Sequence, residues 1–114
     1  MPLQRISLSG IPGGEALQLT TGNNILHTTG INASIYDAIY LYLYNTGTTA
    51  ANSVTLLFDT TQVLIKSISA RPTGLIAISE GLLLSGTGSV GRTVVINPGT
   101  SSTIYVIGYV NRIS

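Results

Sequence analysis

The side chains that could do chemistry in this 114-residue sequence are few and scattered. The chain has one histidine, His27, and no cysteine. A metal site or a nucleophilic active site needs further ligands or a base–nucleophile pair, and no second His or Cys is present to complete either. The four carboxylates are too dispersed to indicate an acid/base pair: Glu15, Asp37, Asp59 and Glu80. The sequence therefore predicts no enzyme, no metal and no cofactor, with His27 as a solvent-facing or hydrogen-bonded structural residue.

One glycine motif matches a nucleotide-binding pattern by letter only. Residues 86–91 read Gly-Thr-Gly-Ser-Val-Gly, which fits G-x-G-x-x-G. That fingerprint needs a helix directly after it, so that backbone N–H groups can bind the pyrophosphate. The residues that follow, 92–98, are typical of a strand and a proline turn, and no acidic residue stands about twenty residues on for the ribose contact. We therefore predict a glycine loop between two strands.

The composition indicates a protein that works inside an assembly. Only 8% of the residues are charged, against about 25% in an average domain, and the mean hydropathy is +0.43. Surfaces with so few charges often contain area that a partner covers. The net charge of +1, from five scattered cations, excludes a basic nucleic-acid-binding patch. The most apolar region, residues 74–84, is interrupted by polar residues, so we expect a soluble chain with no membrane association.

The stretch from Ile35 to Asn45 is the most informative element of the sequence. Aliphatic residues occupy its odd positions, and its even positions carry Tyr36, Tyr40, Tyr42 and Tyr44. Successive side chains of a β-strand point to opposite faces, so this alternation predicts one aliphatic face and one tyrosine face. Asp37 falls on the aliphatic side near the start, where we expect it at the rim or hydrogen-bonded to a turn. The two remaining tyrosines, Tyr105 and Tyr109, lie in the last predicted strand, and we expect the two strands to lie close in one sheet.

The other strands predict an all-β fold. Turn signals recur about every 8–12 residues, as in a sandwich or barrel, and no segment has a helical period. Residues 45–52 are expected to form a hairpin-type connection, and Leu82–Leu84 either continues a strand past a bulge at Gly81 or forms a buried loop. We predict a single-domain antiparallel β-sandwich, jelly-roll-like or a small barrel, of about eight or nine strands. Residues 1–14 form an N-terminal arm or edge strand in this prediction, and residues 15–114 form the sandwich. The expected strands are Leu3–Leu8, Glu15–Thr20, Asn24–Thr28, Ile35–Asn45, Ser53–Asp59, Val63–Ser69, Leu75–Ser79, Arg92–Asn97 and Thr103–Ile113.

The tyrosine row has two interpretations that the sequence leaves open. Tyrosines on a sheet can form cross-strand pairs that stabilise the sheet and leave their hydroxyls in water. Tyrosine is also enriched at protein interfaces, because it combines apolar area with a hydrogen-bonding tip. A sugar-stacking platform is a weaker alternative, because such sites favour Trp and the chain has none.

The C-terminal run from Tyr105 to Ser114, which contains Gly-Tyr-Val-Asn-Arg-Ile, resembles the ending of small β-rich virion proteins of tailed bacteriophages. Three further stretches are similar to that group in type and order: residues 24–29, residues 45–47 with 54–56, and residues 81–84 with the glycine loop that follows. The resemblance covers most of residues 24–114, and residues 1–23 have no counterpart in it.

The resemblance implies a capsid decoration (cement) protein, assembled in the host cytoplasm and bound to the capsid exterior of the virion. Such a protein stabilises the capsid by bridging neighbouring major capsid proteins, and it is often a homotrimer. The expected subunit contacts are the six tyrosines. The expected capsid-contacting arm contains Pro2, Leu3, Gln4, Arg5, Ile6, Leu8 and Ile11, because an extended arm can add to a neighbour's sheet edge. The alternative function is a receptor- or glycan-binding module, or a structural component, of a phage tail or fibre.

Overall fold

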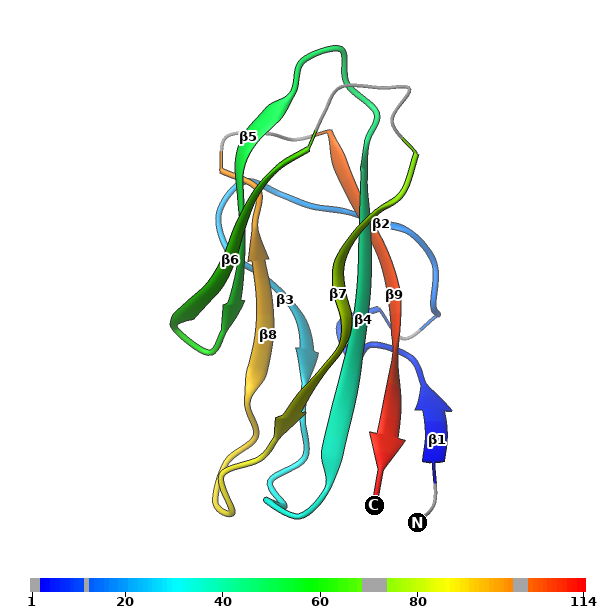
Figure 1. The fold of residues 1–114 in the computed structure, drawn as a ribbon, viewed down its shortest axis with the longest axis vertical. Coiled ribbons are helices and arrows are strands. Elements are labelled where there is room, and N and C mark those ends of the chain that lie inside the picture. The colour runs from blue at the N-terminus through cyan, green and yellow to red at the C-terminus, as the bar shows by residue number, and fades with distance from the viewer. Residues whose placement is uncertain (1–2, 12, 69–73, 100–102) are drawn as a thin grey trace.

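The protein is a sandwich of two antiparallel β-sheets, which confirms the predicted all-β class. The structure is a computed structural model that describes residues 3–11, 13–68, 74–99 and 103–114. These residues form nine strands, which run along the long axis of the molecule (Figure 1). The strands are β1 (Leu3–Ile6), β2 (Leu17–Gln18), β3 (Asn24–Thr28), β4 (Tyr36–Asn45), β5 (Ala51–Phe58), β6 (Thr61–Ile68), β7 (Ile76–Ser85), β8 (Thr93–Asn97) and β9 (Ile104–Ile113).

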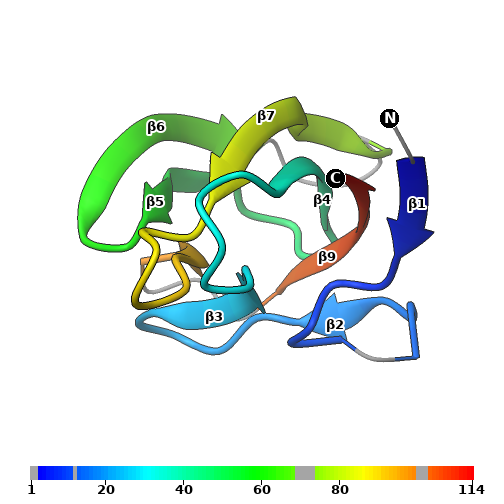
Figure 2. The ribbon, with the colours of Figure 1, turned by 90° about the horizontal axis from the view of Figure 1, so that it is seen from below.

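The first sheet has the strand order β1-β9-β4-β7, and the second has the order β3-β8-β5-β6. The short strand β2 also pairs with β9, on the same side as β1. Viewed along the long axis, β1 and β7 form the two outer edges of the first sheet, with β9 and β4 between them (Figure 2). The predicted proximity of the two tyrosine-bearing strands is confirmed, because β4 and β9 pair over their full lengths.

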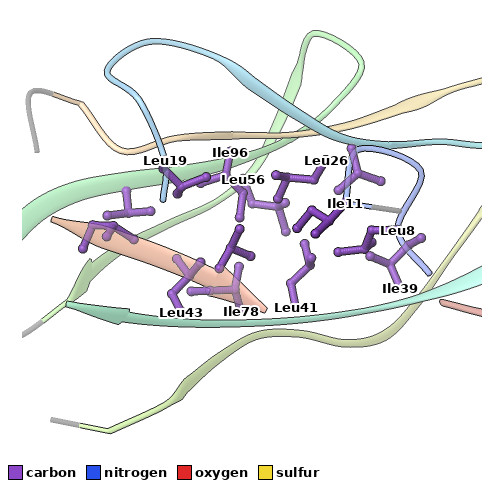
Figure 3. Close-up of a cluster of buried hydrophobic side chains, with 14 of the residues drawn as sticks. Leu8, Ile11, Leu19, Leu26, Ile39, Leu41, Leu43, Leu56, Ile78 and Ile96 are labelled. Atoms are coloured by element: carbon purple, nitrogen blue, oxygen red, sulfur yellow. The ribbon is translucent and has the colours of Figure 1, made fainter. Parts of the chain in front are cut away.

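The core lies between the sheets, and the alternation in β4 explains how it forms. Ile39, Leu41 and Leu43 are fully buried, whereas the intervening tyrosines lie on the opposite face. Their partners on the second sheet include Leu26, Leu56 and Ile96, and the close-up in Figure 3 shows these side chains filling the space between the layers. Burying each such side chain stabilises the fold by about 1.5–3 kcal/mol before conformational entropy is subtracted.

The N-terminal segment belongs partly to the core, which corrects the prediction of a free arm. The strand β1 ends at Ile6 instead of Leu8, because the chain then turns inward between the sheets. Leu8 and Ile11 are 0% and 3% exposed and pack in the hydrophobic core. Pro2 lies outside the described residues. Of the two alternatives for this region, Leu3–Ile6 is an edge strand paired with β9.

The structure corrects the prediction for the connection between β4 and β5, and it decides between the two alternatives at Gly81. The segment between β4 and β5 is not a hairpin, because β4 belongs to the first sheet and β5 to the second. The side-chain oxygen of Asn45 accepts from the Gly47 N–H and the Thr103 hydroxyl, which holds the crossing. At Gly81, φ is +91° and the register to β4 shifts, so β7 continues through a bulge to Ser85.

The glycine loop of residues 86–91 connects β7 to β8, as predicted, and its glycines permit close backbone packing. A Cβ at Gly86 would overlap the carbonyl of Gly30, and one at Gly91 would overlap the carbonyl of Thr29. The Gly88 N–H donates to the Ile31 carbonyl at 2.7 Å. The loop therefore fastens the start of β8 to the segment after β3. In the described ranges no helix is long and apolar enough to cross a membrane.

Candidate functional site

The outer face of the first sheet carries the six tyrosines, and we call these residues the tyrosine face: Tyr36, Tyr40, Tyr42, Tyr44, Tyr105 and Tyr109. The pairing of β4 with β9 places them on one side of two adjacent strands, opposite the core. Tyr36 is 44% exposed, and the others are half-buried by one another. The structure thus brings together all six residues that the sequence singled out.

Two pairs of tyrosines stack across the β4–β9 boundary. The rings of Tyr40 and Tyr109 have centroids 4.7 Å apart and planes inclined by 10°. The rings of Tyr44 and Tyr105 are 5.4 Å apart and inclined by 13°. Each pair occupies directly opposed positions in the register, where cross-strand side chains are closest. The face is therefore held in one arrangement before any partner binds.

Arg5 adds a third layer to one of these stacks. Its guanidinium carbon lies 4.3 Å from the centroid of the Tyr109 ring, a cation–π contact. Its Nε also donates to the Asn111 side-chain oxygen at 3.4 Å. Arg5 covers one face of the Tyr109 ring, and Tyr40 covers the other face. This contact was missed from the sequence, since Arg5 was expected in an arm instead of beside the tyrosines.

Tyr42 stands between the two stacks, opposite Ile107. Partial desolvation by the surrounding side chains raises the pKa of its phenol above the ordinary value, and the neighbouring Tyr109 and Glu80 raise it further. Its hydroxyl is thus a hydrogen-bonding group that stays protonated at any physiological pH. At the end of the second stack, the Tyr105 hydroxyl donates to the Gln18 side chain at 3.3 Å.

A groove of about 500 Å³ crosses the tyrosine face beside Tyr42 and Tyr109. The groove lies where one stretch of the edge of β9 has no neighbouring strand. The strand β1 pairs with Val110 to Ile113, and β2 pairs with Tyr105 and Val106. Between them, residues 107–109 have no strand on that side within the described chain. The lining is mostly apolar and uncharged except for Arg5, and it comprises Arg5, Ile6, Ser7, Gly14, Tyr42, Leu75, Ile107, Gly108 and Tyr109.

The predicted arm residues divide into two groups. Leu3, Gln4 and Arg5 are exposed on β1, and Ile6 is half-buried. Leu8 and Ile11 are core residues, as described above, so their side chains are not free to contact another chain. The accessible part of the expected arm is therefore the edge strand β1, with Leu3 65% exposed.

A second polar cluster lies on the inner side of the sandwich, where His27 of β3 meets two residues of the other sheet. The His27 Nε2 is 2.7 Å from Asp37 Oδ2, and both side chains are at most 2% exposed. Arg112 donates to the same carboxylate twice, from Nε at 2.8 Å and from its terminal nitrogen at 3.0 Å. Burial raises the pKa of Asp37, but the bonds from Arg112 and then His27 outweigh it, so the pKa lies below the ordinary value.

The geometry of this cluster assigns it a structural role. The Ser9 backbone N–H donates to His27 Nδ1 at 3.0 Å, so Nδ1 is unprotonated and Nε2 carries the hydrogen. A catalytic Asp–His pair would turn its second nitrogen toward a nucleophile, and here that nitrogen accepts from a backbone amide. Of the two predicted alternatives for His27, the hydrogen-bonded one holds, since its side chain is buried and not solvent-facing. Asp37 is hydrogen-bonded to His27 and Arg112, not to a turn.

The sequence did not predict that His27, Asp37 and Arg112 form one cluster, although the positions of Asp37 and Arg112 in their strands indicate part of it. Asp37 has the strand parity of the core residues, which marks a buried carboxylate that needs a partner. Arg112 has the corresponding parity in β9 and is its Cα partner in the register. The contribution of His27, from the other sheet, has no such signal. In the described part of the chain, no group of three or more His, Cys, Asp or Glu side chains is placed to hold a metal ion.

Comparison of the chain with protein-family models, with curated proteins and with solved structures finds no match.

Proposed function

We propose that the protein is a structural component of an assembly, and that its subunits associate through the tyrosine face. The observation that carries this proposal is the pair of stacked tyrosine layers on an outer sheet face whose two central strands carry no charged outward side chain. Tyrosines fixed in place lose little conformational entropy on binding, so such a face is suited to burial against protein.

The assembly that we propose is the virion of a tailed bacteriophage, with the protein as a capsid decoration protein that bridges neighbouring major capsid proteins. This setting derives from the sequence resemblance of residues 24–114 and agrees with the low charge of the chain. The exposed edge strand β1, with Leu3 and Gln4, is the surface that we assign to the capsid neighbour, since an open edge can pair with another chain. The threefold symmetry expected from the resemblance stays a prediction.

A glycan-binding tail module receives less support from the geometry. Sugar stacking requires a free aromatic ring face, and in the Arg5–Tyr109–Tyr40 layer the Tyr109 ring has a neighbour on either side. At Tyr109 the ring edge and the hydroxyl remain, which are suited to contacts with a protein surface.

A binding experiment tests the proposed function. Purified protein is mixed with empty expanded capsids of the phage that encodes it, and bound copies are counted after sedimentation. We expect saturation at high copy number and a raised capsid melting temperature. A few copies per particle, or retention on host cells instead of capsids, would contradict the decoration role and favour the tail module.

A further inference from the structure

Among the described strand residues, one charged side chain borders the tyrosine face at each edge of the sheet. Arg5 lies on β1 and Glu80 lies on β7, the two outer strands of the sheet. Every outward position of the two strands between them, β9 and β4, is uncharged. Neither Arg5 nor Glu80 forms an ion pair with another described residue. The face is therefore polarised across the strands, positive at one edge and negative at the other.

These charges lie in one row across the sheet. Tyr40 is the Cα partner of Tyr109 on one side and of Glu80 on the other. The guanidinium of Arg5 leans over the Tyr109 ring, which brings its charge to the end of the same row. The row reads Arg5, Tyr109, Tyr40, Glu80, and three strand spacings of about 4.8 Å separate its ends.

The edge strand β7 adds an apolar surface that has no cover. Leu83 on β7 is the Cα partner of Ala38, on the tyrosine side of β4, and is 56% exposed, and Leu75 just before β7 is 58% exposed. The strand pairs with β4 on one side only. Natural proteins seldom leave a long apolar edge strand unprotected, because it invites pairing with other chains.

We propose that a second copy of this chain packs on the tyrosine face, related by a two-fold axis that runs parallel to β4 and β9. This inference rests on the proposed function and specifies its subunit contact. A rotation about that axis turns the two tyrosine faces toward each other. The row Arg5, Tyr109, Tyr40, Glu80 of one protomer then runs in the opposite direction to the same row of its partner. Arg5 of one protomer then lies opposite Glu80 of its partner, and the same pair forms a second time. A two-fold interface must be self-complementary in this way.

The charge pattern selects this axis among the possible two-fold arrangements. An axis perpendicular to the strands, in the plane of the interface, would place Arg5 over its own symmetry mate and Glu80 over its own. Like charges opposed across an interface repel, which disfavours that arrangement. The chosen axis also lays the β7 edge, with Leu75 and Leu83, over the partner's β1 edge, where Arg5, Ile6 and Ser7 line the groove.

The groove supplies the receiving site for the partner's carboxylate. Arg5 is its one charged lining residue among those described, and Ile107 and Leu75 provide apolar walls. Tyr42 and Tyr109 complete the lining on the side of the tyrosine stacks. The self-complementary row thus favours a two-fold pair over the threefold ring that the resemblance implies.

Charge reversal tests the pairing, measured by analytical ultracentrifugation. Wild-type protein is expected to sediment as a dimer of about 24 kDa, twice the 11.9 kDa of one chain. Arg5→Glu alone opposes two carboxylates twice, and Glu80→Arg alone opposes two cations twice. Each single variant should dissociate at least tenfold more readily. An equimolar mixture of the two variants should regain the dimer, because both contacts in the mixed pair then unite opposite charges.

Arg92→Glu is the matched control, since this exposed cation lies off the face, just before β8, and should leave the dimer intact. Circular dichroism checks that each variant is folded. A monomeric or trimeric wild type, or a mixture that stays dissociated, would overturn the two-fold pairing. A monomer that still saturates capsids would retain the proposed decoration role and remove the pairing of subunits. A dimer that does not bind capsids would retain the two-fold pairing and contradict the decoration role.

Discussion

At the scale of single residues, Asp37 has the environment that most constrains the fold. Its side chain is 2% exposed, and its carboxylate accepts hydrogen bonds from His27 and Arg112. Taking a charge out of water costs several kcal/mol, which only such complete pairing offsets. His27 in turn connects Asp37 to the Ser9 amide, so this one carboxylate ties both sheets to the N-terminal segment.

Replacing Asp37 by Asn should destabilise the protein by about 3 kcal/mol, because Arg112 and His27 would lose the negative charge that they surround. The value belongs at the lower end of the range for buried pairs, since the Arg112 side chain is 33% exposed. Urea denaturation followed by circular dichroism measures the loss. Glu15→Gln, an exposed carboxylate outside any ion pair of the described chain, is the control and should leave stability within about 0.5 kcal/mol.

The same carboxylate predicts an acid dependence of stability. The folded pKa of Asp37 lies below its ordinary value of 3.8, so its ionised form stabilises the fold at neutral pH. That contribution is lost as the pH falls from about 4 through the lower folded pKa, where the native state must also take up the proton. Melting temperatures recorded from neutral to strongly acidic pH should fall in this window. Asp37→Asn should flatten the fall, and an unchanged slope in that variant would contradict the assignment.

Gly108 is the residue whose lack of a side chain the sheet requires. A Cβ there would overlap the carbonyl oxygen of Tyr40, which is backbone and cannot rotate away. Gly108→Ala should therefore cost about 3 kcal/mol or more, at the upper end of overpacking effects. Gly30→Ala, with no atom within 4 Å of its Cβ position, is the matched control and should be nearly neutral. Equal losses for the two variants would show that the contact does not restrain β9.

At the scale of elements, the pairing of β4 with β9 organises the molecule. The two strands align their inner residues in the core and their outer tyrosines in stacks. Single-strand alternation was sufficient to predict the two faces. The partners of each tyrosine depended on the register, which pairs residues 59 to 77 positions apart in the sequence, from Asn45–Ile104 to Tyr36–Ile113.

The stack of Tyr40 on Tyr109 should couple the two strands energetically. A double-mutant cycle with Tyr40→Ala and Tyr109→Ala should give a coupling energy of about 0.5–1.5 kcal/mol, the usual range for aromatic pairs. Tyr36 and Tyr105, which form no ring contact with each other, make the control cycle and should be additive. Coupling near zero in the first cycle would mean that the rings add only their separate burial.

At the scale of the whole molecule, the N-terminal segment closes one side of the sandwich. After β1 the chain leaves the sheet, places Leu8 and Ile11 between the layers and returns as β2. This detour creates the interval between β1 and β2 on the edge of β9, and with it the groove. The core and the groove are therefore two consequences of one path of the chain.

Leu8→Ala should destabilise the protein by about 2–5 kcal/mol, as expected for a fully buried leucine. Leu3→Ala removes the same atoms from a side chain that is 65% exposed and should have little effect on monomer stability. Thermal or urea unfolding of the two variants makes the comparison. A neutral Leu8→Ala would restore the alternative in which the segment is an arm independent of the core.

The sequence by itself determined the all-β class, the two faces of β4 and the glycine loop, because each follows from local periodicity or from turn chemistry, whereas it left the bulge at Gly81 as one of two alternatives. Only the tertiary structure decided which residues far apart in the sequence come into contact. It brought Arg5 to Tyr109, His27 to Asp37, and Leu8 into the core, and it turned residues 45–52 into a crossing between sheets. Strand order depends on the burial of all faces at once, so no local pattern in this chain encodes it.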